Sequence, residues 1–158
     1  MRQIMKKCFE DFPDGFTRNF KVGGLSKTDI TDFATQFDPQ RFHLNEEEAR
    51  KTHFGGLVAS GFQTQLLCFK VFCEEVLLNT WAVGAPGIDR LKWIRPWYPG
   101  EDLDVSVVLI SKRQSSSRMD RGYLEFKLMA QSNNRPTLEM EWVVIVLTRD
   151  GAPGVEKA

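Results

Sequence analysis

The chain has little that would support disulfides, a metal site or a redox centre. Its 158 residues include three cysteines, Cys8, Cys68 and Cys73, and no CxxC pair. So few cysteines at such spacing are best interpreted as buried free thiols, which fits a reducing cytoplasm. No cluster of Cys, His and Asp has the spacing of metal ligands, and no dinucleotide or Walker fingerprint occurs. We therefore expect no metal and no bound cofactor.

An excess of charge of one sign is also missing. The 21 basic and 21 acidic residues give a formal net charge of zero. Nucleic-acid binding and adhesion to anionic membranes both need an excess of basic residues, so neither partner is expected. The most apolar stretch, residues 57–78, contains Lys70, Glu74 and Glu75, which excludes a membrane span. The N-terminal residues lack the apolar core of a secretory signal, so we expect a cytoplasmic protein.

The second half of the chain has the patterns of β-strands. Four stretches are strand candidates: 87–98, 101–114, 121–132 and 136–149, of which 121–132 alternates apolar and polar residues. Turn-forming sequences such as "SNNRP" separate them, which predicts antiparallel strands joined by hairpins. The last stretch is apolar on both faces over 142–147. It is therefore expected at the centre of the sheet or beneath a second subunit.

The first half begins with a predicted strand over about 16–22 and continues with helices. Ser26 is a natural N-cap with Asp29 three residues later, and this helix should end near Phe37, because Pro39 disfavours helical geometry at Asp38. Asn45 caps a short acidic turn. Residues 54–79 then predict a long helix, apolar on nearly all sides, that occupies the core; it begins within the glycine-rich stretch 54–61 and ends near Asn79.

The order of these elements predicts an α+β protein with a single domain. An antiparallel β-sheet wrapped around one long central helix accounts for it, and this arrangement is the hotdog fold. The domain is expected to span residues 1–158, with its core at about 16–149 between an N-terminal extension and a C-terminal tail. Such a sheet leaves its edges unpaired, so we expect a homodimer or a higher homo-oligomer.

Asp38 and His43 are the candidate catalytic pair. They stand five residues apart on either side of a turn that contains Pro39. A carboxylate and an imidazole that converge across such a turn can hold and polarise one water molecule. Gly61 follows at the start of the long helix. Backbone N–H groups there lack partners within the helix, so they are free to donate, and they lie at the positive end of the helix dipole. Such an N–H can stabilise the oxygen of a thioester enolate.

The stretch "FDPQRFHLNEEEARKTHFGGLVASG", residues 37–61, resembles the MaoC-like dehydratases and R-specific enoyl-CoA hydratases. Their signature is an aspartate, a histidine five residues on, and a glycine-rich start to the hotdog helix. The stretch "DRLKWIRPWYPGEDLDVSVVL", residues 89–109, is also similar to them. The resemblance implies that Asp38 and His43 are the catalytic dyad, and that the N–H of Gly61 polarises the thioester carbonyl.

The same resemblance implies the reaction: water adds reversibly to a trans-2-enoyl-CoA to give the (3R)-3-hydroxyacyl-CoA. Coenzyme A enters only as part of the acyl-CoA substrate. The chain departs from the family at Gln40, where many members have Asn, and at Ser60, where many have His.

Further substrate contacts are expected near the glycine-rich stretch and on the third predicted strand. The candidates are Phe54, Gly55, Gly56, Ser60 and Arg95. Trp93, Arg95 and Trp97 alternate and should share one strand face. This face packs at a subunit contact, or else it directs Arg95 to a coenzyme A phosphate or to the dyad loop.

Two other functions remain open at this point. A hotdog thioesterase would direct water at the thioester carbonyl instead of the double bond. A non-catalytic acyl-CoA-binding hotdog protein would bind without turnover, because fold alone does not determine function.

Overall fold

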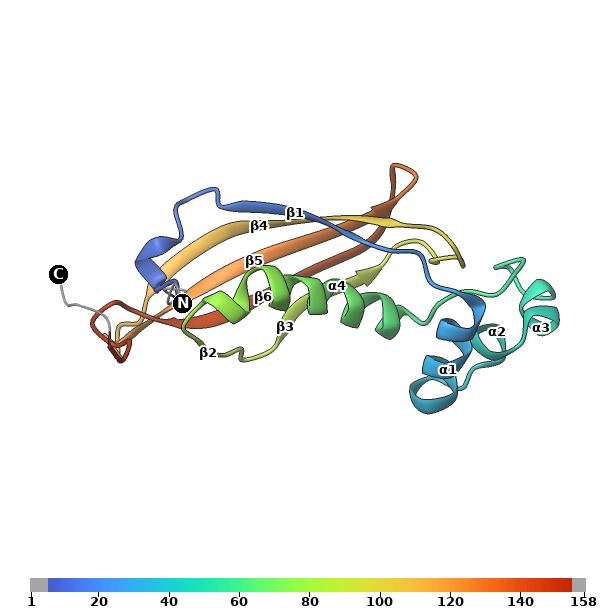
Figure 1. Cartoon of the computed structure of the whole chain (residues 1–158), viewed down its shortest axis with the longest axis horizontal. Helices are drawn as coiled ribbons and strands as arrows, with labels where there is room; N and C mark the ends of the chain where they lie inside the picture. Colours follow the sequence, from blue (N-terminus) through green and yellow to red (C-terminus); the bar gives the residue numbers. More distant parts are fainter. Residues whose placement is uncertain (1–5, 155–158) are drawn as a thin grey trace, which may run out of the picture.

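An antiparallel sheet with one long helix against it makes up most of the molecule (Figure 1). The computed structural model describes residues 6–154; the outermost ends of the predicted extension and tail lie outside the described residues. The strands are β1 (Thr17–Val22), β2 (Ala82–Gly84), β3 (Ile88–Trp93), β4 (Leu103–Gln114), β5 (Arg121–Ser132) and β6 (Arg135–Leu147). The helices are η1 (Phe9–Asp11), α1 (Lys27–Phe37), α2 (Arg41–Leu44), α3 (Glu46–Arg50), α4 (Gly61–Glu75) and η2 (Leu77–Asn79).

The long strands pair as the sequence predicts. The sheet order is β1-β4-β5-β6-β2, and β3 also pairs with β6, beside β2. The turn between β5 and β6 is formed by Asn133 and Asn134, which both have positive φ, and Ser132 pairs with Arg135. Asparagine tolerates this left-handed backbone, so "SNNRP" makes a tight two-residue hairpin. β6 has neighbours on both sides, which confirms its predicted central place.

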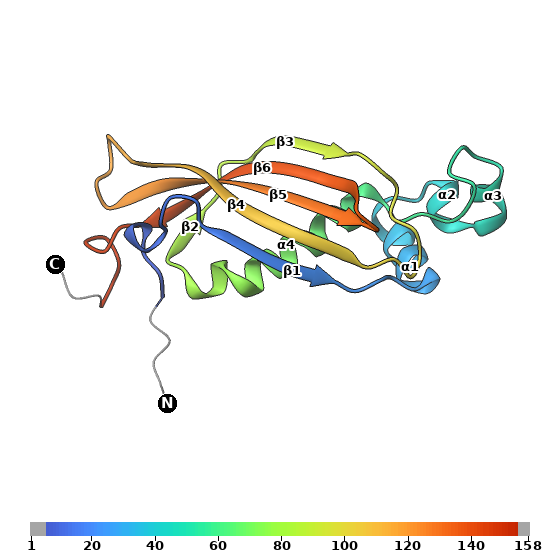
Figure 2. The ribbon, with the colours of Figure 1, turned by 90° about the horizontal axis from the view of Figure 1, so that it is seen from above.

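One face of the sheet forms the hydrophobic core with α4. Alternate residues of β5 are buried: Leu124, Phe126, Leu128 and Ala130. The two views in Figures 1 and 2 agree that α4 runs along this face of the sheet. The protein therefore has the predicted hotdog fold of the α+β class.

The central helix is shorter and less enclosed than its composition predicts. It begins at Gly61, because residues 57–60 are irregular, and Ser60 is its N-cap. The expectation that it is buried on all sides is wrong for the single chain, since Phe62 and Leu66 are each 52% exposed. The sheet covers only one side of the helix, and the side with Cys68 and Phe72 faces it.

The predicted strand over 87–98 ends early, at Trp93. The N–H groups of Ile94 and Arg95 both donate to the carbonyl of Thr137, which breaks the alternation of a strand. Trp93 and Trp97 therefore do not share a face: Trp93 is 49% exposed and Trp97 is 1% exposed. Residues 94–101 form a loop beside the start of α4.

Helices α1, α2 and α3 lie beyond one end of the sheet (Figures 1 and 2). The side chain of Ser26 accepts from the N–H of Asp29, so the predicted capping box is present, and α1 ends at Phe37 as expected. Asn45 caps α3 through the N–H of Glu48. These caps direct the chain so that Asp38 and His43 lie at the junction of α1 and α2.

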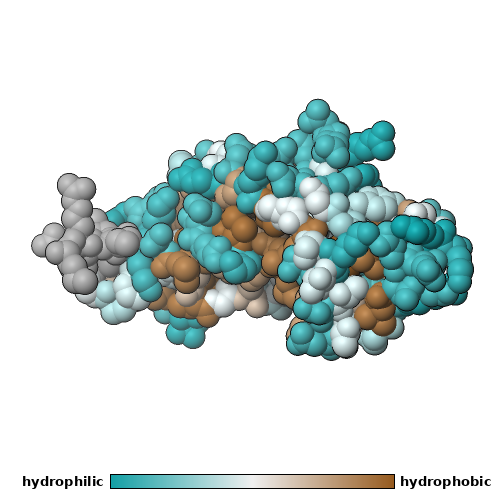
Figure 3. Space-filling model, turned by 45° about the vertical axis from the view of Figure 1, so that its right-hand side comes forward, coloured by the Kyte–Doolittle hydropathy of each residue, from teal (hydrophilic) through white to brown (hydrophobic). Residues whose placement is uncertain are grey.

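The surface is uneven in polarity. Figure 3 shows apolar side chains gathered in the middle of one face, with hydrophilic side chains around them. Among residues 6–154, no helix is long and apolar enough to cross a membrane.

Candidate active site

Asp38 and His43 meet at the end of the sheet where α4 begins. The Oδ2 atom of Asp38 is 3.4 Å from Nε2 of His43, and both side chains are largely buried. Asp38 is the C-cap residue of α1, and Pro39 keeps it out of helical geometry (φ −151°, ψ 70°). The short helix α2 then turns the imidazole back toward the carboxylate. The structure therefore brings the predicted pair together.

The tautomer of His43 follows from its other ring nitrogen. Nδ1 lies 2.7 Å from the carbonyl oxygen of Val58, which can only accept a hydrogen bond. Nδ1 must therefore carry a proton, and in the neutral ring Nε2 has a free lone pair facing Asp38. The backbone N–H of Val58 in turn donates to the carbonyl of Phe42, so the two segments hold each other.

The carboxylate of Asp38 accepts two side-chain hydrogen bonds. The hydroxyl of Ser60 donates to Oδ2 at 2.6 Å, and Nε2 of Gln40 donates to Oδ1 at 2.8 Å. Burial alone would raise the pKa of Asp38, but these two hydrogen bonds and the nearby His43 hold that pKa below its usual value. Asp38 is therefore ionised at neutral pH. Ser60 and Gln40, the two departures from the family pattern, both act on this carboxylate.

Gly61 is the first residue of α4, directly after the Ser60 N-cap. The N–H of Phe62 donates to the Ser60 hydroxyl, whereas the N–H of Gly61 has no hydrogen-bond partner among residues 6–154. A Cβ atom at Gly61 would lie 2.5 Å from the indole of Trp93. Glycine is thus required at this position for the close approach of Trp93, a packing reason that the sequence did not reveal.

A cavity of about 490 Å³ opens beside the dyad. Five predicted site residues line it: Asp38, His43, Gly61, Phe54 and Arg95. The other three predicted residues, Gly55, Gly56 and Ser60, do not line it. Ser60 instead donates its hydroxyl hydrogen bond to the carboxylate of Asp38. Gly55 lies in a turn and has a positive φ of 69°.

The model for the MaoC like domain matches residues 15–125, about 70% of the chain. This chain belongs to the MaoC-like domain family. A curated relative is the uncharacterized protein YdeM of Bacillus subtilis, which is 35% identical over 103 residues, 65% of this chain and 71% of that protein. The family match, over residues 15–125, includes the dyad, Gly61 and the strands up to the start of β5.

Solved structures agree with this assignment. A MaoC-like dehydratase from Rhodospirillum rubrum superposes with a TM-score of 0.79 at 28% identity, covering 90% of this chain and 98% of that one. The R-hydratase PhaJ1 from Pseudomonas aeruginosa has a TM-score of 0.67 at 17% identity, covering 89% and 86%. The second likeness is one of fold alone.

In this MaoC-like site, Arg95 is already paired. Its guanidinium makes two hydrogen bonds of 2.9 Å to the carboxylate of Glu101 and lies over the ring of Tyr98. The hydrogen bonds from Arg95 lower the pKa of Glu101 and raise that of Arg95. The pair stabilises the loop 94–101. A hydrogen bond from the Tyr98 hydroxyl to the carbonyl oxygen of Phe54 also fixes this loop. Arg95 therefore lines the cavity while Glu101 holds its guanidinium.

Several residues of the site were missed by the sequence reasoning. The cavity is also lined by Thr64, Trp93, Trp97 and Thr137. Thr137 belongs to β6, far from the dyad in sequence, and no local pattern marks it. Within residues 6–154, no group of three or more His, Cys, Asp or Glu side chains is placed to hold a metal ion.

Proposed function

We propose that this protein is a hydro-lyase that adds water reversibly to a trans-2-enoyl-CoA, giving a (3R)-3-hydroxyacyl-CoA. The observation that carries the proposal is the facing pair of Asp38 Oδ2 and His43 Nε2, 3.4 Å apart on a cavity that also includes Gly61. Two proton acceptors this close can share one water molecule, which donates one O–H to each.

The dyad takes one proton from the water and gives one proton to the substrate. The water oxygen forms a bond to C3 of the enoyl group, and its proton passes to the dyad. The π electrons move toward the thioester, and the dyad returns one proton to C2. The step needs Asp38 ionised, a state that its hydrogen bonds favour. It also needs His43 as the tautomer with its proton on Nδ1, so that Nε2 can accept.

The thioester oxygen gains negative charge during this step. The N–H of Gly61, which has no partner within residues 6–154, lies at the positive end of α4 and is a suitable donor to that oxygen. Because the thioester itself acidifies C2, the proposed reaction uses no metal and no redox cofactor. A cytoplasmic location fits the three free cysteines.

The test is to follow crotonyl-CoA with the purified protein by loss of enoyl absorbance, while free thiol is measured in the same sample. The proposal expects absorbance loss without thiol release, and chiral analysis should give the 3R product. Thiol release would indicate a thioesterase. Binding without either change would indicate an acyl-CoA-binding protein.

Ser60 offers a prediction on pH dependence. Its hydroxyl lowers the pKa of Asp38, so Ser60→Ala should raise that pKa. Catalysis needs ionised Asp38, so activity should disappear at a higher pH than in the wild type as the pH falls. The acid limb of the kcat/KM profile should therefore move to higher pH. Ser60→Thr, which keeps a hydroxyl, should leave the limb near its wild-type place.

The loss of the N-cap is a separate effect of Ser60→Ala. It should destabilise the fold by about 1 kcal/mol, measured as the free energy of unfolding in urea. This loss reduces the amount of folded enzyme without moving the acid limb. An unmoved limb in Ser60→Ala would contradict the role given to this hydroxyl.

We also propose that two copies associate at the β3 edge. In the described chain β3 pairs only with β6, so its outer edge is unpaired. Beside that edge are half-exposed apolar side chains: Phe62 and Leu66 of α4, and Ile88 and Trp93 of β3. An unpaired edge with an adjoining apolar surface fits a C2 pairing.

Light scattering after gel filtration should therefore give the mass of two chains. Leu66→Glu places a charge in the proposed contact and should shift the mass to one chain. Ile110→Glu alters an apolar residue of similar exposure on β4 and is the control, expected to remain dimeric. A monomeric wild type, or a dimeric Leu66→Glu, would exclude this contact.

A further inference from the structure

The cavity beside the dyad is closed toward the protein interior. Its inner lining includes Thr64, Trp97 and Thr137, which are all almost fully buried. Thr64 is three residues after Gly61, less than one helical turn of about 5.4 Å along α4. A thioester whose carbonyl lies at the Gly61 N–H therefore meets this inner wall after a short distance.

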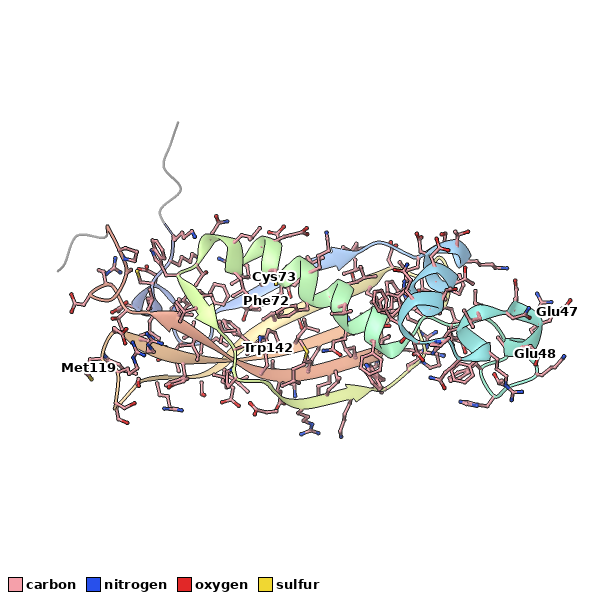
Figure 4. All side chains as sticks on the ribbon, turned by 90° about the horizontal axis from the view of Figure 1, so that it is seen from below. Glu47, Glu48, Phe72, Cys73, Met119 and Trp142 are labelled. Atoms are coloured by element: carbon pink, nitrogen blue, oxygen red, sulfur yellow. The ribbon has the colours of Figure 1, made fainter. Side chains whose placement is uncertain are left out.

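Beyond Thr64, aromatic rings fill the space between α4 and the sheet. The ring of Phe72 lies 5.0 Å from Trp142 and 5.1 Å from Phe126, and Phe69 lies 6.1 Å from Trp142. Figure 4 shows Phe72 and Trp142 next to each other between α4 and the strands. None of these four rings lines the cavity. An acyl chain cannot continue along the core without displacing closely packed aromatic side chains.

The side of the cavity toward β3 is closed by Trp93. Trp93 pairs with buried Leu138, so its side chain is on the face of the sheet that α4 covers. Its indole lies against Gly61 and makes an edge contact with Phe62, at 5.0 Å between ring centroids. It thus joins the start of α4 to the end of β3.

Past this indole runs a strip between α4 and β3. Leu91 is two residues before Trp93 and points to the same face, since it pairs with Met140. Leu66 is one turn after Phe62 on the helix. These side chains are apolar, so the space that a smaller residue at position 93 would open beside the cavity would have apolar walls suited to a longer acyl chain.

We propose that the site accepts small acyl groups, of the size of crotonyl, and that the Trp93 indole sets this size limit. The inference rests on the proposed hydratase function and specifies its substrate. Trp93 acts here as a specificity-determining residue: it limits the length of the chain and takes no part in proton transfer. Apolar burial normally favours longer chains, so a preference for a short one requires a wall of this kind.

The experiment compares kcat/KM for crotonyl-CoA and trans-2-octenoyl-CoA in wild type, Trp93→Ala and Ile110→Ala. Wild type should favour crotonyl-CoA by roughly tenfold or more, as pocket discrimination by methylene groups allows. Trp93→Ala should raise the octenoyl-to-crotonyl ratio at least about tenfold. Ile110→Ala removes an apolar side chain of similar exposure that does not line the cavity, and it should not change the ratio. Because the ratio is taken within one sample, it does not depend on the fraction of folded protein.

A wild type that uses octenoyl-CoA as well as crotonyl-CoA would overturn the size limit. If Trp93→Ala keeps the wild-type oligomeric state and its octenoyl-to-crotonyl ratio is unchanged, Trp93 does not set the size limit. If no enoyl-CoA is turned over, the hydratase function fails, and the size limit is then tested by calorimetry with butyryl-CoA and octanoyl-CoA. Tighter binding of butyryl-CoA, reversed in Trp93→Ala, would support the limit; equal binding, or no binding, would overturn it.

Discussion

Asp38→Asn should lower kcat for crotonyl-CoA hydration by about 100-fold or more, the usual range for general acid–base groups. The substitution removes the charge and one proton-accepting oxygen while it keeps the shape of the side chain. The new amide can still accept from the Ser60 hydroxyl, and its NH₂ group can donate to a reoriented Gln40 amide. The fold should therefore survive, and the loss can be measured at pH 7 in the absorbance assay.

His43→Asn is the companion variant. An asparagine amide placed like Nδ1 can keep the donation to the Val58 carbonyl, but it has no atom in place of Nε2. We expect a loss as large as for Asp38→Asn, and a double variant that is not much worse than either single one, since the two groups act as a unit.

The exposed Asp32 of α1 gives the control, since Asp32→Asn also replaces an aspartate, within the helix that precedes the Asp38 cap, and should keep full activity. A folded Asp38→Asn protein with more than about a tenth of wild-type activity would show that this carboxylate is not part of the chemistry.

Gly61→Ala should have the second-largest effect. The added methyl group would lie 2.5 Å from the Trp93 ring, so the indole must move. Such overpacking typically costs about 1–3 kcal/mol in the free energy of unfolding. The methyl group would also hinder the thioester oxygen at the Gly61 N–H, and removal of one such donor lowers kcat about 100-fold or more.

The double variant Gly61→Ala/Trp93→Ala separates the two reasons for glycine. Without the indole the methyl group has space, so urea unfolding should return toward the stability of Trp93→Ala alone. Activity on crotonyl-CoA should stay low, because the methyl group remains at the position where the carbonyl binds. Recovery of activity together with stability would show that Gly61 serves packing alone, and the carbonyl role would be withdrawn.

Much of the architecture could be predicted because it depends on short-range patterns. The strict alternation in 121–132 places Leu124 and Phe126 on the core side wherever the strand lies. Ser26 and Pro39 define the start and end of α1 through local backbone chemistry. The pairing of Asp38 with His43 is also short-range, since one turn connects them, although the roles of these residues came from a resemblance.

The rest was decided by contacts between distant segments. Ser60 reaches Asp38 across 22 positions, and the Val58 carbonyl selects the tautomer of His43 across 15. The indole of Trp93 lies against Gly61, where a larger residue would leave no room for it, and no spacing pattern in the sequence indicates this contact.

The sequence by itself thus determined the elements, the hotdog order and the candidate dyad, because propensity, capping and periodicity act over a few residues. Only the tertiary structure decided the ionisation of Asp38, the end of β3 at Trp93 and the half-exposed face of α4. These features depend on which surfaces meet when the helix packs on the sheet, and that packing is a property of the whole chain.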